Sequence, residues 1–176
     1  GRKFNFLDPD PESITIVDIA HALSQTCRFG AHINLFYSVA DHSFNVARIV
    51  AWKGGNAHTM AAALVHDASE AYLGDVVTPL KRLLPLVTEI EKNLLTIMHR
   101  KFGIDDTQVD FASIKRADET MLVVEAKSFF NFPPLENWTD KFHAEPLRIP
   151  PHVSRSHREA EIYFLAAAEM LLHPEK

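Results

Sequence analysis

The sequence predicts an all-α protein that forms a single domain over residues 1–176. Apolar residues recur at the three- and four-residue spacing of amphipathic helices, and no stretch of useful length alternates as a half-buried strand does. The length is that of one ordinary domain. With 47% apolar and 23% charged residues, the composition suits a globular protein that buries a core without disulfide or zinc crosslinks.

Glycines divide the first half of the chain into helices. We expect helices over about residues 15–25, 38–52 and 57–72. Gly54-Gly55 ends the second of these helices and Gly74 ends the third, because glycine favours a helix terminus. Residues 28–34, between the first two helices, are expected to form a loop.

Prolines divide the second half. Pro79 and Pro85 bracket a short turn or helix over residues 80–84, and Pro85 suits the first turn of a long helix. We expect the later helices over about residues 85–102, 110–130 and 155–172. Five prolines within residues 131–152 indicate an ordered loop or lid, which follows a core spanning about residues 15–130.

Charge and composition exclude several classes of partner. The net charge is −5, and no lysine or arginine run is long enough to line a nucleic-acid groove. No apolar run approaches the length of a transmembrane helix, and no signal peptide is recognisable. Cys27 is the only cysteine, which rules out an internal disulfide and fits a reducing compartment. We therefore expect a cytoplasmic protein that binds neither nucleic acid nor membranes.

The string HDASEAYLGD carries the first functional signal. His66 and Asp67 are adjacent, and a histidine beside a carboxylate can clamp one metal ion. Glu70 shares their helix face, where it can act as a general acid or base. Asp75 can protonate a leaving group or orient Glu70, although both carboxylates also fit an ordinary solvated surface.

Two further candidate ligands, His42 and Asp118, lie on largely apolar helix faces. His42 shares its face with valine and isoleucine side chains, and Asp118 shares one with Ile114 and Met121. A buried carboxylate must be paired or metal-bound, so a salt bridge for Asp118 and a hydrogen-bonded core role for His42 are the alternatives. Glu125, two turns after Asp118, indicates that this face is wetter than its apolar members suggest.

These residues together form a chemically complete ligand set, which consists of His42, His66, Asp67 and Asp118. Two imidazoles and two carboxylates favour a divalent transition-metal ion such as Mn²⁺, Fe²⁺, Co²⁺, Ni²⁺ or Zn²⁺, and make Mg²⁺ the poorer fit because it prefers oxygen. Such an ion lowers the pKa of bound water and polarises a phosphoryl group.

Longer motifs resemble a known family, the HD-domain metal-dependent phosphohydrolases. The motifs that carry this resemblance are Arg28-Phe29, Val39-Ala40-Asp41-His42-Ser43, the run HDASEAYLGDVVTPLK and Lys115-Arg116-Ala117-Asp118-Glu119. Within that superfamily they are most similar to the small bacterial 5′-deoxynucleotidases and their uncharacterised prophage-type relatives. The likeness covers most of residues 15–130, and the HDxSExxxGDxxTPxK pattern is its most specific part.

The resemblance implies a helical HD-domain bundle that hydrolyses a nucleotide, most readily a deoxynucleoside 5′-monophosphate. It assigns the metal to His42, His66, Asp67 and Asp118, acid–base chemistry to Glu70 and Asp75, and substrate contacts to Arg28, Phe29 and Lys81. Arg28 would grip the phosphate as a planar fork, and Lys81 would assist it as a point charge. A homodimer is also implied. A single ion is expected, because branches with two ions carry extra histidines soon after the pair, whereas the next histidine here is His99.

Departures from the family pattern leave the phosphate number open. Phe29 stands where the deoxynucleotidases carry tryptophan, Arg82 follows Lys81, and His32 adds an imidazole. The added basic groups suit a longer phosphate chain. A deoxynucleoside triphosphate triphosphohydrolase is therefore the first alternative, and it requires Arg82 and Lys115 to line the pocket with Lys81. A catalytically silent nucleotide-binding or interaction protein is the second.

Overall fold

The computed structural model describes residues 4–130, 142, 144 and 155–172, and this part of the chain is all-α. The helices are α1 (Ile16–Gln25), α2 (Val39–Trp52), α3 (Ala57–Leu64), α4 (Glu70–Leu73), α5 (Thr78–Lys81), α6 (Pro85–Lys101), α7 (Phe111–Phe129) and α8 (His157–Leu171). Three short 3-10 helices accompany them: η1 (Pro11–Ser13), η2 (Phe29–Ala31) and η3 (Asp106–Gln108). The all-α fold class is therefore confirmed over the described residues.

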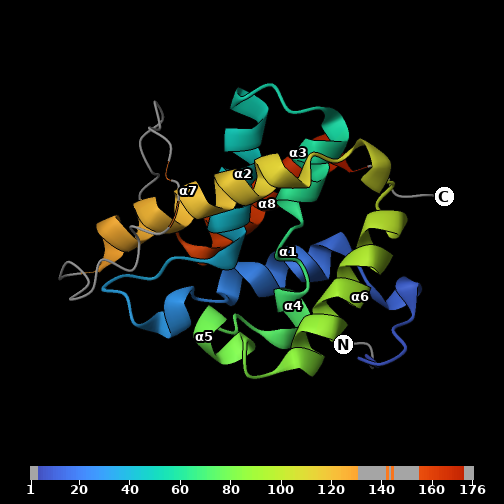
Figure 1. The fold of residues 1–176 in the computed structure, drawn as a ribbon, viewed down its shortest axis with the longest axis horizontal. Coiled ribbons are helices and arrows are strands. Elements are labelled where there is room, and N and C mark those ends of the chain that lie inside the picture. The colour runs from blue at the N-terminus through green and yellow to red at the C-terminus, as the bar shows by residue number, and fades with distance from the viewer. Residues whose placement is uncertain (1–3, 131–141, 143, 145–154, 173–176) are drawn as a thin grey trace.

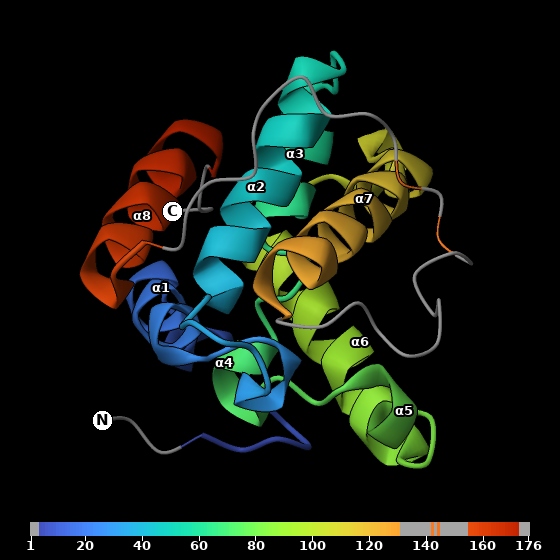
Figure 2. The same ribbon diagram turned by 90° about the vertical axis from the view of Figure 1, so that its left-hand side faces the viewer.

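Helix α2 is the centre of the bundle. It contacts α1, α3, α7 and α8, and α8 also packs on α1 and α3. Figure 2 shows α1 and α8 on one side of α2, with α6 and α7 on the other, and in Figure 1 α7 crosses in front of α2 and α3. Any side chain that α2 turns toward α7 therefore lies in the interior of the bundle.

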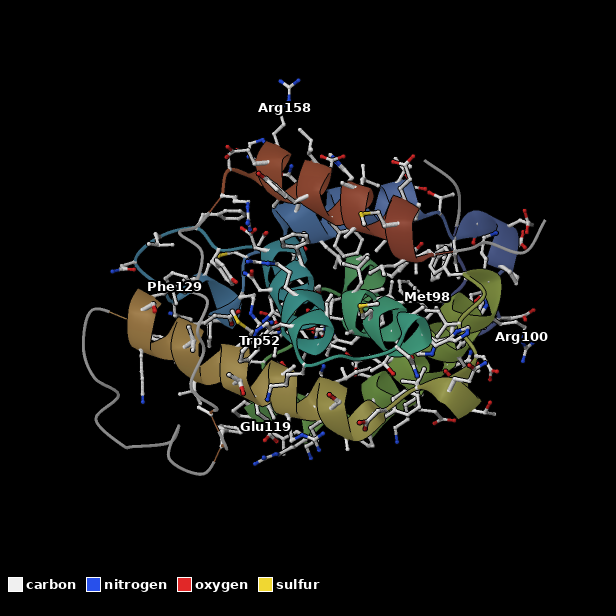
Figure 3. The ribbon with its side chains drawn as sticks, turned by 90° about the horizontal axis from the view of Figure 1, so that it is seen from above. Trp52, Met98, Arg100, Glu119, Phe129 and Arg158 are labelled. Carbon is white, nitrogen blue, oxygen red and sulfur yellow. The ribbon has the colours of Figure 1, made fainter. Side chains whose placement is uncertain are left out.

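The core fills the space between these helices with aliphatic and aromatic side chains. Its fully buried members include Ile19, Leu23, Val39, Val46, Leu64, Leu94, Met98 and Phe164. In Figure 3, Met98 of α6 lies inside the bundle, whereas Arg100 and Arg158 extend outward from α6 and α8. The apolar side chains expected beside His42 and Asp118, among them Val46, Ile114 and Met121, are buried. Leu86 and Phe111, in the first turns of α6 and α7, are 58% and 52% exposed.

Capping side chains fix where most of the long helices begin. In each case a side-chain oxygen accepts a hydrogen bond from a backbone N–H of the first turn, which would otherwise have no intrahelical partner. The caps are Thr15 on α1, Ser38 on α2, Asn56 on α3, Asp110 on α7 and Ser156 on α8. The expected helices near residues 15–25, 38–52, 85–102, 110–130 and 155–172 accordingly begin and end within two residues of the observed bounds.

The predicted continuous helix over residues 57–72 is wrong. Helix α3 ends at Leu64, and α4 begins only at Glu70. Between them the backbone makes tighter three-residue hydrogen bonds, such as Ala68 N–H to Val65 O at 2.9 Å. The imidazole of His66 bonds the carbonyl of Ala63 at 2.8 Å, and that carbonyl would accept from the N–H four residues on in a continuous α-helix.

Two other expectations concern the proline-rich segments. The short element predicted for residues 80–84 lies earlier, as α5, because Pro79 sits within its first turn rather than before it. The loop or lid expected over residues 131–152 falls almost wholly outside the described residues. Among the helices that the structure describes, none is both long and apolar enough to cross a membrane.

Phe164 provides a test of the packing of α8. Its ring is 0% exposed, so we expect Phe164→Ala to leave a cavity and to lower the free energy of unfolding by about 3–5 kcal/mol. Met170, on the same helix, is 79% exposed, and Met170→Ala should change stability by no more than about 0.5 kcal/mol. Chemical denaturation of both variants measures the difference. Similar stabilities for the two would contradict the assigned burial of α8.

Candidate metal centre

Three separate parts of the bundle carry the four predicted ligands. His42 lies in the first turn of α2, His66 and Asp67 lie in the turn between α3 and α4, and Asp118 lies in the middle of α7. His42 Nε2 is 3.1 Å from Asp118 Oδ1 and 3.7 Å from Asp67 Oδ2. His66 Nε2 is 3.3 Å from Asp67 Oδ2 and 4.0 Å from Asp118 Oδ1. Within the described residues, His42, His66 and Asp118 each offer a ligand atom within 4.8 Å of the other two. Asp67, the fourth predicted ligand, lies near both imidazoles but is not part of this mutually close group.

These separations match what one first-row ion requires. With metal–ligand bonds of about 2.1 Å, adjacent ligand atoms lie about 3.0–3.4 Å apart and opposite ones about 4.2 Å apart. The four nitrogen–oxygen distances fall within or near those ranges. His42, His66 and Asp118 therefore fit a single divalent cation, and Asp67 approaches both imidazoles closely enough to join them.

The Nε2 atoms of the two imidazoles make no hydrogen bond of good geometry, although Nε2 of His42 lies only 3.1 Å from Asp118 Oδ1. Both Nε2 atoms are buried. Nδ1 of His42 lies 2.8 Å from Glu125 Oε1, and Nδ1 of His66 lies 2.8 Å from the carbonyl oxygen of Ala63. Because both partners are oxygen acceptors, each Nδ1 donates, and the lone pair of the neutral ring is left on Nε2. In the neutral rings, the lone pairs therefore lie on the two Nε2 atoms, each of which is near Asp67 Oδ2 and Asp118 Oδ1.

The electrostatics of the cluster favour positive charge. Although burial and the charge of Arg28 oppose it, Glu125 and Asp118 raise the pKa of His42 to about 9. Burial alone would raise the pKa of Asp118, but the proximity and charge of His42, with those of His66 and Arg28, hold it below its ordinary value. A cation bound here would replace a proton on His42 as the partner of the carboxylates.

An isolated backbone bridge sets Arg28 beside the first turn of α2. Arg28 N–H donates to Tyr37 O at 2.9 Å, and Val39 N–H donates to Thr26 O at 3.0 Å. The guanidinium is then directed inward, where Nε lies 3.0 Å from Glu125 Oε2 and Nη1 lies 3.6 Å from Asp67 Oδ2. The surrounding carboxylates raise the pKa of Arg28 above its ordinary value in spite of burial. Arg28 therefore brings a fixed positive charge to the rim of the candidate metal centre.

The residues after Arg28 form a strained left-handed turn. Phe29, Gly30 and Ala31 have φ values of 58°, 56° and 62°. A non-glycine residue in this region costs roughly 1–2 kcal/mol, so neighbouring contacts must hold the turn in place. The ring of Phe29 meets that of Phe130 edge to face at 5.3 Å and lies 5.4 Å from the guanidinium carbon of Arg28. Phe29 thus supports the arginine, and the expected loop is a fixed turn.

Glu70 is the first residue of α4 and is almost fully buried at 6% exposure. Its Oε2 atom is buried without a hydrogen-bond partner. Burial, together with the negative charges of Asp67 and Asp75, raises the pKa of Glu70 to about 9. Asp75 itself is partly exposed, just beyond Gly74. A buried carboxyl group beside the ligands is suited to moving a proton.

Lys81 also lies near Glu70, but its principal partner was not predicted. Lys81 Nζ is 3.9 Å from Glu70 Oε1 and 2.8 Å from Glu91 Oε1 on α6. Glu91 is 8% exposed and belongs to a helix that the sequence marked only by its apolar stripe. Lys81 is therefore held between two carboxylates.

Glu125 is the residue of the candidate centre whose contacts sequence reasoning missed. Its position two turns after Asp118 suggested a wetter helix face, yet its side chain is 0% exposed. In spite of burial, the charges of Arg28 and His42 and a hydrogen bond from Tyr37 lower the pKa of Glu125. An acidic residue at heptad spacing from another, on a face of apolar residues, was the available signal.

The first turn of α2 is anchored from the opposite side as well. Arg155, just before α8, donates from Nη1 to Asp41 Oδ1 at 2.6 Å and from its backbone N–H to Asp41 Oδ2 at 3.2 Å. Its guanidinium carbon lies 4.5 Å from the ring centroid of Tyr163. Because Asp41 immediately precedes His42, this buried contact fixes the backbone that carries the imidazole.

Comparison with known proteins places the chain among bacterial relatives. No protein-family model matches it. Uncharacterized protein YfdR of Escherichia coli (strain K12) is 36% identical over 127 residues, covering 72% of this chain and 67% of that protein. Uncharacterized protein RCAP_rcc00048 of Rhodobacter capsulatus is 34% identical over 173 residues, covering 87% of this chain and 86% of that protein. At these identities and coverages, the chain belongs to the same family as these two bacterial proteins.

Proposed function

We propose that this protein is an HD-domain metal-dependent phosphohydrolase that cleaves the phosphate ester of a deoxynucleoside 5′-monophosphate. The observation that carries the proposal is the convergence of two unpartnered imidazole nitrogens, on His42 and His66, with the carboxylates of Asp67 and Asp118. Buried imidazole nitrogens without a partner are costly, and one divalent ion would satisfy them together with the two partly exposed carboxylates. The sequence motifs that resemble the HD-domain family contain these same residues.

The groups around the cluster have complementary roles in hydrolysis. When bound, the ion supplies Lewis-acid polarisation of the phosphoryl group and acidification of water. Arg28, whose Nε contacts Glu125 and whose Nη1 lies 3.6 Å from Asp67 Oδ2, binds the phosphate through its Nη groups. Glu70 moves a proton as water adds to phosphorus, and Asp75 orients Glu70 or protonates the leaving oxygen. Lys81 adds positive charge near Glu70.

The positions of the other basic residues favour a monophosphate over a triphosphate. Arg82 is exposed, and the side chain of Lys115 is 76% exposed and directed toward Glu119 at 3.9 Å. A triphosphatase would need these charges in the pocket to bind the additional phosphates. Lys81 is the one member of that set near the cluster, and it is already engaged by Glu91.

Burial of Glu70 favours an enzyme over a silent binding protein. A carboxyl group at 6% exposure with an unpartnered oxygen costs stability, and binding of a nucleotide gives no reason to retain it. The proposal also includes a cytoplasmic location, which a single cysteine fits, and the homodimer that the resemblance implies.

Assays of purified protein against deoxynucleoside and ribonucleoside mono- and triphosphates, with Mn²⁺ or Co²⁺ and identification of the products, test the proposal. Release of inorganic phosphate from a deoxynucleoside monophosphate is the expected result. Release of inorganic triphosphate from a triphosphate would favour the triphosphatase instead. Absence of turnover with every nucleotide and metal would favour the silent binder.

The metal ligands can be tested without any substrate. We expect His66→Ala and Asp67→Ala to lose stoichiometric Mn²⁺ or Co²⁺, since each removes one ligand from a set of four. His21, whose side chain is 65% exposed on α1, provides the matched control, and His21→Ala should retain the ion. Elemental analysis and titration calorimetry give the stoichiometry. Unchanged metal content in either ligand variant would remove that residue from the site.

Glu70 should separate metal binding from catalysis. Glu70→Gln keeps the shape of the side chain but removes its proton-transfer function, so kcat should fall about 10²- to 10⁴-fold while the metal content stays the same. Glu89, an exposed glutamate on α6, is the control, and Glu89→Gln should keep the wild-type rate. Steady-state kinetics at saturating metal provide the measurement. A wild-type kcat for Glu70→Gln would exclude Glu70 from the mechanism.

A further inference from the structure

Glu125 links two parts of the site that are far apart in sequence. One carboxylate oxygen, Oε1, lies 2.8 Å from Nδ1 of His42, and the other, Oε2, lies 3.0 Å from Nε of Arg28. These partners precede Glu125 by 83 and 97 residues. One side chain on α7 therefore contacts both a candidate metal ligand and the candidate phosphate-binding arginine.

The surroundings of Glu125 allow it little freedom. Its side chain is 0% exposed, and it also accepts a hydrogen bond from the hydroxyl of Tyr37, whose ring is 1% exposed. The Tyr37 hydroxyl in turn accepts from Nδ2 of Asn45 at 3.0 Å, which orients the tyrosine proton toward Glu125. With donors on both oxygens and a third from Tyr37, the carboxylate cannot rotate without breaking a contact.

The two main partners use Glu125 for different purposes. The contact with Nδ1 keeps the proton of His42 on that atom and leaves Nε2 free to bind a cation. The contact with Nε fixes the plane of the Arg28 guanidinium, which decides where its two Nη groups are presented. If Glu125 only formed a structural salt bridge, contact with Arg28 would suffice. If it only oriented a histidine, contact with His42 would suffice.

We propose that Glu125 is a shared positioning residue that holds the imidazole of His42 and the guanidinium of Arg28 at a fixed separation, so that one buried carboxylate sets the affinity for both the cation and the phosphate. The inference rests on the proposed function in that it takes Arg28 as the phosphate-binding group. It adds a residue that lies outside the motifs that resemble the HD-domain family. Both consequences concern binding, so they can be measured without turnover.

The decisive variant is Glu125→Gln, which has nearly the same volume. The amide offers one acceptor oxygen and one donor NH₂ group, so it cannot accept from His42 and Arg28 at once, and one contact becomes donor against donor. We expect Co²⁺ affinity to fall about 10- to 100-fold. With Co²⁺ saturating, we also expect the affinity for inorganic phosphate to fall about 10-fold, because a fixed guanidinium is lost. Calorimetric titrations with Co²⁺, and then with phosphate, give both constants.

Glu161 provides the matched control. It lies on α8, and its Oε2 atom is 3.5 Å from Nδ1 of the exposed His21, so it makes a carboxylate–histidine contact remote from the site. Glu161→Gln should bind Co²⁺ and phosphate as the wild type does. A fall in Co²⁺ affinity alone for Glu125→Gln would overturn the shared role, and unchanged affinities for both ligands would overturn any positioning role.

Tyr37→Phe keeps the inference testable if Glu125→Gln does not fold. It removes one neutral donor to Glu125 while the buried ring stays in place. The two affinities should then fall together, each by roughly 2- to 10-fold for the loss of one such hydrogen bond. A change in only one of them would contradict the shared role. If wild-type protein binds Co²⁺ and phosphate but hydrolyses nothing, the proposed function fails while the role of Glu125 stands.

Discussion

The buried carboxylate of Glu125 is the interaction on which the arrangement of the site depends. An uncompensated charge in the interior costs several kcal/mol, so the bundle can enclose Glu125 only if cationic or hydrogen-bonding partners reach it. His42 and Arg28 do so from α2 and from the turn before it. In turn, Arg28 lies near the carboxylate of Asp67, and His42 lies near that of Asp118. The candidate site is thus organised around Glu125, which contacts His42 and Arg28 and need not touch a bound ion or phosphate itself.

The packing of α2 explains why this network can be rigid. Helix α2 contacts four other helices, and its first turn is held on one side by Glu125 and on the other by the contact between Arg155 and Asp41. A helix turn supported from both sides keeps the orientation of its side chains. The packed apolar core around this turn therefore also holds its polar residues in place.

Much of the candidate site could be predicted because its residues are polar groups at helical spacing among apolar ones. His42 and Asp118 were recognisable in this way, and His66-Asp67 by adjacency. The break in the helix at residues 65–69 could not be predicted. It involves a hydrogen bond between the His66 side chain and the backbone carbonyl of Ala63, and apolar spacing carries no information about hydrogen bonds. Glu125 and Glu91 were missed for a related reason. Their roles depend on which side chains face them across the bundle, and periodicity along one helix carries no such information.

The long sequence separations within the network have a consequence for how the protein folds. Arg28 and Glu125 are 97 positions apart, and His42 and Glu125 are 83 apart, so neither pair can form until α7 has docked on α2. Closing loops of this length is entropically costly, and the gain is realised only when both ends have met. A partly folded chain therefore carries unneutralised charges on surfaces that are destined for the interior. Assembly of the bundle and completion of the site should consequently be one late cooperative step, with little ligand-competent structure before it.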